Sequence, residues 1–310
     1  MTPKPRCSII IRAYNEEKHL GNLLERIQRQ TVKDIETVLV DSGSTDNTLG
    51  IAGRYPVKIE HIRSEEFTFG RSLNLGISAA RADLVVLASA HVLPINERWL
   101  EHLLAPFGDE DVALSYGMQR GGEGSQFSED QHWRRWFPEH SDWDQPHAYC
   151  NNANAAIRKS LWEQQPYDEE LTGLEDLAWS SWVKDKGYKI AYVAEAGVIH
   201  LHDEDRAQIF NRHRREAIAL KRILPASDFS IWNFLSMWLR RTASDWRAAW
   251  RQNQFLYKAW SALRFRLLQY WGVYRGYRDA GHVTEEMKQV FYYSPGLLET
   301  RRPQEGNGHD

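Results

Sequence analysis

Short apolar runs alternate with helix-like segments along the first two thirds of the chain. Unbroken apolar runs of strand length fall at residues 7–11, 35–40, 57–62, 84–88 and 112–116. Apolar side chains at the three- and four-residue spacing of a helix fall at residues 20–27, 70–80 and 96–107. This alternation predicts an α/β fold with a mostly parallel, doubly wound sheet.

One of these runs, at residues 84–88, is apolar enough to be buried on both faces of the sheet. It ends abruptly in Ser89, Ala90 and His91, and Pro94 predicts that the chain leaves the sheet there. Ligands of open α/β sheets bind at the carboxyl ends of the strands. We therefore expect a ligand site at these small and polar residues, although a plain turn with a single histidine gives the same pattern.

Polar side chains also follow the first two predicted strands. Asp41 comes directly after the second strand, where its carboxylate can accept the N3 proton of a uracil or thymine ring or bond the backbone of its own turn. Arg12, Tyr14 and Glu16 follow the first strand and would complete a nucleoside pocket. Glu16 is equally suited to the first turn of the next helix, for which Asn15 is a candidate cap.

The later part of the domain is less regular. Residues 117–148 are rich in Gly, Trp, His and acidic residues and show no periodicity, which predicts an irregular functional insertion. A return to the sheet is expected at residues 150–157, a helix at residues 174–186, and short strands at residues 190–193 and 197–199. From residue 205 to about residue 280 the composition is helical.

The C-terminal region differs in charge from the rest of the chain. Residues 1–204 hold 21 Lys and Arg against 32 Asp and Glu, a net charge of −11, whereas residues 205–282 hold 15 against 5, a net charge of +10. The second region also carries six of the 13 tryptophans. This pattern predicts contact with a polyanion or an anionic membrane surface; docking against the acidic domain and pairing in a homodimer fit it as well.

Composition excludes several other classes of protein. Two cysteines are too few for a disulfide scaffold, and the sequence shows neither a secretory signal pattern nor the run of about 20 apolar residues that spans a bilayer. The expected location is therefore the cytoplasm. Nucleic acid is not an expected partner, because no recognised basic motif is present and the larger domain is acidic.

Four ordered motifs resemble those of one known family. Ser-Ile-Ile-Ile-Arg-Ala-Tyr-Asn-Glu-Glu starts at Ser8, and Val-Leu-Val-Asp-Ser-Gly-Ser-Thr-Asp-Asn-Thr starts at Val38. Gly-Leu-Glu-Asp occupies residues 173–176, and His-Leu-His occupies residues 200–202. From residue 7 to about residue 204, the chain is similar to family-two glycosyltransferases with the GT-A fold.

This resemblance implies an inverting glycosyltransferase. Residues 67–70 and 97–100 look most like the rhamnosyltransferase type of bacterial surface-polysaccharide synthesis. The expected reaction moves a sugar from a UDP-, dTDP- or GDP-linked donor to a lipid-linked or polysaccharide acceptor at the cytoplasmic face of the bacterial membrane. Residues 117–148 would then shape the acceptor side. The alternative is a non-catalytic partner protein of a glycan-assembly complex that keeps the GT-A fold.

The resemblance also implies roles for single residues. Asp176 is the expected general base that takes the proton of the acceptor hydroxyl, with Glu175 as the second candidate. Arg71 is expected to contact the base or the diphosphate of the donor, and Asn152 to bond sugar hydroxyls. Further donor contacts are expected from residues at the strand ends: Arg12, Tyr14, Glu16, Asp41, Ser89 and Ala90.

The chain departs from the family at the metal site. Family members carry Asp-x-Asp at the end of the fourth strand, where this sequence has Ser89, Ala90 and His91. Serine is a poor ligand, and a neutral imidazole suits Mn-like or Zn-like ions better than Mg²⁺. Either His91 holds a Mn-like ion together with His200 or His202 when the donor is bound, or no metal is used and His91 donates a hydrogen bond to the diphosphate directly.

These patterns divide the chain into three parts. Residues 1–204 are expected to form the GT-A catalytic domain, residues 205–300 a basic, Trp-rich helical extension, and residues 301–310 a disordered tail. The extension interleaves tryptophan with arginine, as at Trp246 and Arg247, which suits an interfacial helix beside anionic lipid.

Overall fold

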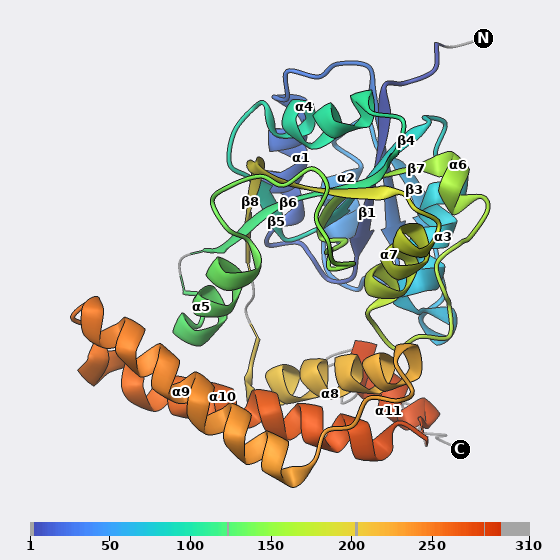
Figure 1. The fold of residues 1–310 in the computed structure, drawn as a ribbon. Helices are drawn as coiled ribbons and strands as arrows, with labels where there is room; N and C mark the ends of the chain where they lie inside the picture. The colour runs from blue at the N-terminus through green and yellow to red at the C-terminus, as the bar shows by residue number, and fades with distance from the viewer. Residues whose placement is uncertain (1–2, 123, 202–203, 282, 293–310) are drawn as a thin grey trace, which may run out of the picture.

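The structure is a computed structural model that describes residues 3–122, 124–201, 204–281 and 283–292 (Figure 1). The strands are β1 (Cys7–Ala13), β2 (Ile35–Asp41), β3 (Lys58–His61), β4 (Leu84–Ser89), β5 (Val92–Pro94), β6 (Val112–Gly121), β7 (Asn154–Arg158) and β8 (Lys189–His200). Within these described ranges, they form one sheet in the order β3-β2-β1-β4-β7-β6-β8-β5. The tail expected at residues 301–310 lies outside the described residues.

The sheet is mostly parallel, as the sequence predicts. β1 pairs in parallel with β2 and β4, β2 with β3, and β6 with β8. β7 lies antiparallel between β4 and β6, and β5 lies antiparallel to β8 at the sheet edge. The register sets Arg12 opposite Ser89, and Ala13 opposite Asp41. The carboxyl ends of β1, β2 and β4 therefore meet at one edge.

Helices cover both faces of the sheet. They are α1 (Leu20–Gln28), α2 (Thr48–Ala52), α3 (Phe69–Ala79), α4 (Trp99–Leu104), α5 (Phe127–Trp136), α6 (Lys159–Trp162) and α7 (Glu175–Asp185), with 3₁₀ turns η1 (Ser64–Glu66) and η2 (Ala105–Gly108). α1 and α4 share one apolar core with the sheet, and α3, α6 and α7 share a second core on the other face. Ile9 and Ile11 of β1 face the first core and Ile10 faces the second, so the predicted α/β architecture is confirmed.

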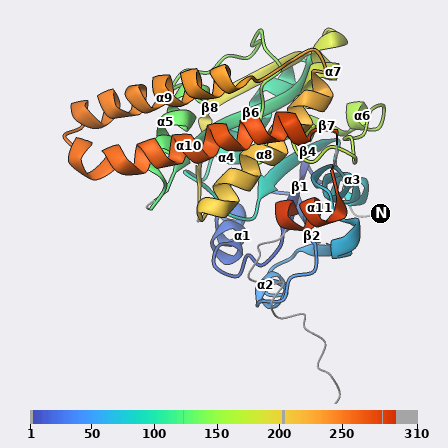
Figure 2. The ribbon, with the colours of Figure 1, turned by 90° about the horizontal axis from the view of Figure 1, so that it is seen from below.

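The C-terminal region is helical, as predicted. Its helices are α8 (Arg206–Ile223), α9 (Ile231–Arg251), α10 (Phe255–Asp279) and α11 (Glu285–Tyr292). Figure 1 shows them beneath the sheet, and Figure 2 shows α9 and α10 as a hairpin seen from that side. Arg266 of α10 forms a buried ion pair with Asp245 of α9 (2.8 Å) and donates to the main-chain oxygen of Ser128 in α5 (2.8 Å). The hairpin is thereby joined to the insertion between β6 and β7.

Two predictions about single residues are wrong. Pro94 does not take the chain out of the sheet, because it ends β5, an edge strand in which the missing N–H is tolerated. Asn15 does not cap α1, whose N-cap residue is His19. Asn15 instead has a φ of 54°, and its amide oxygen accepts the N–H of Thr45 (2.8 Å). A local bond across two loops replaces the expected helix cap.

Two segments are more regular than predicted. The insertion at residues 117–148 contains the end of β6 and the whole of α5, whose first turn is acidic and whose last turn is basic, as the helix dipole favours. The two short strands expected at residues 190–193 and 197–199 are one strand, β8. The pairing of β8 with β6 shifts register between Gly117 and Gln119 of β6. This irregularity coincides with the break in the apolar pattern of β8 between residues 193 and 198.

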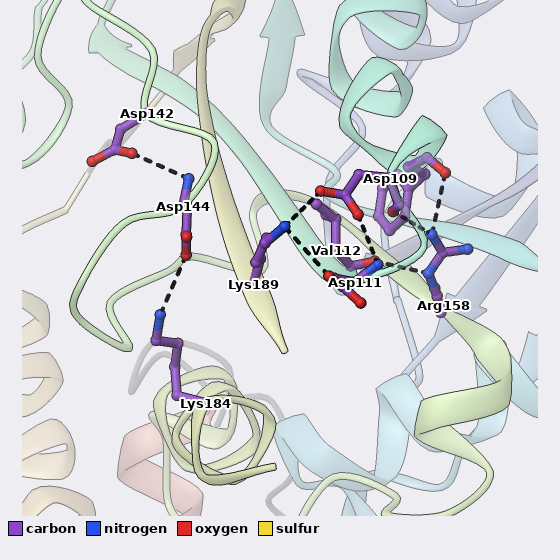
Figure 3. A network of polar contacts seen from close by, with 9 residues as sticks. Asp109, Asp111, Val112, Asp142, Asp144, Arg158, Lys184 and Lys189 are labelled. Atoms are coloured by element: carbon purple, nitrogen blue, oxygen red, sulfur yellow. Dashed lines mark hydrogen bonds and ion pairs between the residues drawn. The ribbon is translucent and has the colours of Figure 1, made fainter. Parts of the chain in front are cut away.

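Charged side chains form a network of contacts at the end of the sheet that lies opposite the carboxyl ends of β1, β2 and β4 (Figure 3). Lys189, at the start of β8, lies 2.8 Å from Asp109 and 3.4 Å from Asp111, just before β6. Arg158, at the end of β7, donates to the main-chain oxygen of Val112 (2.7 Å). These contacts join three strands at the edge that lies away from the carboxyl ends of β1 and β2. Because these ion pairs are partly exposed, solvent screens them and they add little to the stability of the fold.

Candidate active site

Asp41 lies at the carboxyl end of β2 and is buried. Its Oδ2 accepts the N–H of Gly43 (3.0 Å), and its Oδ1 accepts the N–H of Ser44 (3.2 Å). These are the contacts of a turn-stabilising aspartate. A carboxylate offers about four acceptor positions. Asp41 can therefore hold its own turn and still accept an N–H from a nucleobase.

The loops after β1 and β2 are bonded to each other. The amide oxygen of Asn15 accepts the N–H of Thr45 (2.8 Å), and the main-chain N–H of Glu16 donates to Thr48 Oγ1 (2.7 Å). Tyr14 and Glu16, both half-buried, are thereby held against the turn that follows β2. The structure brings together the two strand ends that the sequence predicts as a nucleoside pocket.

Arg12 points from the end of β1 toward the start of α7. Its Nη1 lies 3.8 Å from Glu175 Oε1, and its guanidinium lies over the ring of Phe69, 4.9 Å from the ring centre. The guanidinium of Arg215, from α8, lies 4.4 Å from the centre of the same ring. Two cations thus gather around one aromatic ring at the carboxyl edge. Such a concentration of positive charge suits an anionic diphosphate.

Asp176 follows Glu175 in the first turn of α7 but has different surroundings. Its Oδ2 accepts the main-chain N–H of Asn152 (3.2 Å), and its Oδ1 accepts that of Leu177 (2.8 Å). Burial, reinforced by the negative charge of Glu175, raises the pKa of Asp176 to about 7. Glu175 faces the Arg12 cation instead. A carboxylate that titrates near neutral pH is suited to general-base catalysis.

Four buried nitrogens at this edge have no hydrogen-bond partner among the described residues. They are Arg12 Nη1, Gln119 Nε2, Asn152 Nδ2 and Arg215 Nε. A buried donor without an acceptor costs about 1–3 kcal/mol, and of the four only Arg12 Nη1 has a carboxylate of the described residues in reach, Glu175 Oε1 at 3.8 Å. Phosphate oxygens and sugar hydroxyls are acceptors for such donors. The predicted contact of Asn152 with a sugar stays a prediction.

His91 and His200 lie face to face at the same edge. Their ring centres are 5.0 Å apart, and the ring of Trp133 stacks on His200 at 5.8 Å. His91 Nδ1 lies 2.6 Å from Glu16 Oε1, and His200 Nδ1 lies 2.7 Å from Gln119 Oε1. In a neutral ring whose Nδ1 donates to its partner oxygen, Nε2 is the nitrogen that can bind a metal.

The described residues do not complete a metal site by themselves. No group of three His, Cys, Asp or Glu side chains within the described ranges is placed to hold an ion. Burial lowers the pKa of His91, but the carboxylate of Glu16, with a further contribution from Glu204, raises it by more, so the net shift is upward. His202, the third predicted ligand, lies outside the described residues. His91 and His200 can therefore supply only part of a ligand set.

The structure gives less support to three other residues predicted to contact the sugar donor: Ser89, Ala90 and Arg71. Ala90 is fully buried, and Ser89 is half-buried with its N–H bonded to the main-chain oxygen of Ala153 (3.3 Å). Arg71 is exposed in the first turn of α3, and its guanidinium lies 3.9 Å from Glu66. These three donor contacts stay predictions.

Phe69, Arg215 and Gln119 also lie at the site, although no sequence pattern marks them as site residues. Phe69 lies in a segment whose resemblance to rhamnosyltransferases marks it only in general terms. Arg215 is one of many basic residues in a helical region, and Gln119 lies in an insertion without periodicity. Their roles depend on contacts between segments far apart in the chain, so no local signal could have found them.

A doubly wound sheet with buried carboxylates, arginines and unsatisfied N–H donors at its carboxyl edge is typical of enzymes that transfer a group from a nucleotide-linked substrate. Comparison with known proteins gives the particular family. Residues 8–164 match the profile described as Glycosyl transferase family 2. The chain belongs to this family and is a glycosyltransferase.

Two curated relatives cover most of the chain. The O-antigen chain rhamnosyltransferase WbaN of Salmonella anatum is 30% identical over 221 residues, which are 67% of this chain and 70% of that protein. The O-antigen chain rhamnosyltransferase RfbN of Salmonella typhimurium is 25% identical over 221 residues, with the same shares of the two chains.

Solved structures share the fold at lower identity. A mannosyltransferase from Pyrobaculum calidifontis, in complex with GDP-Man and Mn²⁺, superposes with a TM-score of 0.61 at 17% identity and covers 87% of this chain and 86% of its own. Glucosyl-3-phosphoglycerate synthase from Mycobacterium tuberculosis, with Mn²⁺, UDP and phosphoglyceric acid, superposes with a TM-score of 0.55 at 18% identity and covers 72% and 80%. Together they show the GT-A fold.

We expect Asp41→Ala to weaken donor binding without removing the chemistry. The substitution deletes a charged acceptor, which corresponds to about 1.5–3 kcal/mol, or roughly 10- to 150-fold in the dissociation constant of the donor. Calorimetric titration of nucleoside diphosphates measures it. Asp41→Asn is the matched variant, because it keeps an oxygen for the turn while losing the charge. Unchanged affinity in both variants would show that Asp41 only holds its turn.

Proposed function

We propose that this enzyme transfers a sugar, with inversion at the anomeric carbon, from a nucleotide-diphospho-sugar to a lipid-linked or polysaccharide acceptor in bacterial surface-glycan synthesis. The relatives named as O-antigen chain rhamnosyltransferases support rhamnose or a related deoxyhexose, carried by dTDP, UDP or GDP. The observation that carries the proposal is the α7 carboxylate pair, in which Asp176 titrates near neutral pH beside a Glu175 that faces Arg12.

The donor is assigned to the edge formed by β1, β2 and β4. Its base would lie against the turn after β2, where Asp41 accepts an N–H. Its diphosphate would lie near Arg12 and Arg215, where Arg12 Nη1 and Arg215 Nε make no hydrogen bond within the described residues. We assign Asn152 to the sugar, because its backbone N–H donates to Asp176 and its amide nitrogen makes no hydrogen bond within the described residues.

The chemistry needs one base and one stabilised leaving group. Asp176 takes the proton of the acceptor hydroxyl while that oxygen attacks the anomeric carbon. The new carbon–oxygen bond forms as the bond from that carbon to the diphosphate breaks. A single displacement of this kind inverts the anomeric carbon and releases the nucleoside diphosphate. Arg12 and Arg215 balance part of the negative charge that develops on the leaving group.

A divalent ion is the expected cofactor, because two proteins with the same fold were solved with Mn²⁺. Two described residues would contribute ligands: His91, whose Nδ1 lies 2.6 Å from Glu16 Oε1, and His200, whose Nδ1 lies 2.7 Å from Gln119 Oε1, an arrangement common in metal-binding histidines. When bound, a Mn-like ion would add positive charge at the diphosphate. We expect it to bind only with the donor, whose oxygens complete the ligand set.

Removal of the metal should therefore slow the enzyme. We expect turnover to fall in EDTA and to recover with Mn²⁺ better than with Mg²⁺. Mn²⁺ should bind the wild type only when nucleoside diphosphate is present, and His91→Ala should abolish this binding, as measured by titration calorimetry. His102→Ala, on α4, is the control histidine and should leave it intact. Full activity in EDTA would eliminate the metal, and wild-type activity of His91→Ala would remove this residue from the site.

The proposed function is tested first by a donor screen. Thermal shift and calorimetry across UDP-, GDP- and dTDP-linked sugars should reveal one preferred nucleotide, whose affinity falls in Asp41→Ala. The replacement of Asp-x-Asp by Ser89, Ala90 and His91 favours one alternative, a GT-A protein without catalysis. That alternative predicts a bound donor that is never turned over, whereas absence of any nucleotide binding contradicts both.

A further inference from the structure

The α9–α10 hairpin exposes most of the large apolar side chains found at the surface. Nine of the thirteen exposed large apolar side chains in the described part of the chain lie on these two helices. Trp232 and Trp250 are 75% and 71% exposed, and Leu256 is 91% exposed. Other aromatic residues of α9 point inward, since the indole N–H of Trp246 donates to the main-chain oxygen of Ala259 in α10 (2.9 Å). Two of the exposed side chains also contact the other helix of the hairpin: Trp250 lies 5.7 Å from the ring of Phe255, and Trp271 lies 5.6 Å from the ring of Phe234.

The outward side chains form one line on each helix. On α9, Trp232, Leu239 and Trp250 are separated by 7 and 11 residues, which keeps them within about 20° of one another around the helix axis. On α10, the line comprises Leu256, Trp260 and Leu267, all exposed and within about 40°. The exposed arginines of α9 fall roughly 60–100° to one side of its line: Arg240, Arg247 and Arg251.

The surface of the hairpin is positively charged. Residues 231–279, which span α9 and α10, contain nine Lys and Arg and two acidic residues, Asp245 and Asp279, of which Asp279 is paired with Arg214 of α8. Asp245 is buried and paired with Arg266, so it does not offset the charge at the surface. The exposed apolar side chains therefore lie on a surface whose charge is mainly positive.

We propose that the α9–α10 hairpin is a membrane anchor that lies flat in the headgroup region of an anionic bilayer. Leu and Trp side chains enter the boundary between headgroups and acyl chains, and the flanking arginines meet anionic lipid. In the described residues, no helix combines the length and apolar character needed to cross a bilayer. Pairing with a second copy is disfavoured, because it would bring two surfaces of the same charge together.

The anchor also orients the active site. Figures 1 and 2 show the hairpin on the side of the molecule reached by α8 and α11. Arg215 of α8 and Tyr292 of α11 both contact Phe69 at the carboxyl edge of the sheet. The carboxyl ends of the strands therefore lie on the same side of the sheet as the anchor, which suits a lipid-linked acceptor. This consequence rests on the proposed function, whereas the anchoring itself needs neither donor nor acceptor.

Vesicle sedimentation of the full chain tests the anchor. We expect binding to phosphatidylcholine vesicles that contain phosphatidylglycerol, little binding to phosphatidylcholine alone, and quenching of Trp fluorescence by brominated lipid. Replacement of Arg240, Arg247 and Arg251 by Gln should lower partitioning about 100-fold, since each basic residue near an anionic surface contributes roughly fivefold. Replacement of Trp232, Trp250 and Trp260 by Ser should lower it at least about tenfold.

Control variants and two further measurements distinguish membrane anchoring from dimerisation and from DNA binding. Trp143→Ser changes a tryptophan that is 50% exposed away from the hairpin and should leave partitioning unchanged. Circular dichroism should show wild-type melting for all variants, since the replaced side chains are exposed. Wild-type protein that ignores anionic vesicles while sedimentation equilibrium shows a dimer dissociated by the Trp changes would assign the surface to a second copy. Binding of duplex DNA in place of vesicles would also overturn the proposal.

Discussion

Asp176→Asn is expected to abolish sugar transfer while leaving donor binding nearly unchanged. The amide has almost the same size and keeps an oxygen for the N–H of Asn152, but it cannot take a proton from the acceptor. Loss of a positioned general base lowers turnover by roughly 100- to 10,000-fold. The measurement is acceptor-dependent release of nucleoside diphosphate, together with calorimetric titration of the donor.

Glu175→Gln is the matched control for this substitution. It removes the neighbouring carboxylate, which faces Arg12, and should reduce turnover less than Asp176→Asn does. It should also lower the pKa of Asp176, because the negative charge of Glu175 is one cause of the upward shift. Near-normal turnover of Asp176→Asn combined with an inactive Glu175→Gln would move the base to Glu175.

The pH dependence of the wild type follows from the same carboxylate. A base works in its deprotonated form, and Asp176 has its pKa raised to about 7. We therefore expect kcat/KM to be low in acid, to rise through neutral pH and to level off above it. In Glu175→Gln, the rise should move to lower pH. A profile that stays flat across neutral pH contradicts the assignment of Asp176.

Arg266→Ala is expected to produce the largest loss of stability. Arg266 and Asp245 are both almost fully buried, and removing the cation leaves Asp245 as an unpaired charge inside the hairpin. Breaking a buried pair in this way costs about 3–5 kcal/mol. The contact to Ser128 in α5 is lost as well, so the hairpin should separate from the insertion. Urea unfolding followed by circular dichroism measures the change in the free energy of unfolding.

Two further variants give this stability prediction its controls. Arg275→Ala removes an exposed arginine whose nearest carboxylate, Asp279, is 3.8 Å away, and it should cost no more than about 1 kcal/mol. Replacing Arg266 with Met and Asp245 with Leu together should recover much of the loss, because no charge then stays buried. Equal effects of Arg266→Ala and Arg275→Ala would mean that the buried pair of Arg266 and Asp245 does not stabilise the hairpin.

The sheet was predictable because its signal is local. A strand such as β1 has to be apolar on both faces, and Ile9, Ile10 and Ile11 show this directly in the sequence. The errors arose where pairing partners decide the outcome. Pro94 is compatible with a strand only because β5 lies at the edge, next to β8 alone, and the sequence does not reveal which strand lies there.

The site was predictable only in part, for a similar reason. Motifs identify Asp176 and Glu175, but their difference arises from packing: Arg12 approaches one carboxylate, and burial beside Asn152 acts on the other. The stacking of Arg215 on the ring near Arg12 requires that α8 lies under the sheet. No pattern within α8 encodes that contact. Sequence alone therefore gave the residue types at the site but not the surroundings that decide their chemistry.

The most direct test of the whole account is the structure of the product. The wild type is incubated with the preferred nucleotide-sugar and a lipid-linked oligosaccharide acceptor, and the anomeric configuration of the added sugar is read by NMR. We predict one added sugar whose configuration is opposite to that in the donor, and no product with Asp176→Asn. A retained configuration, or a donor that binds tightly but is never transferred to any acceptor, would contradict an inverting glycosyltransferase with Asp176 as its base.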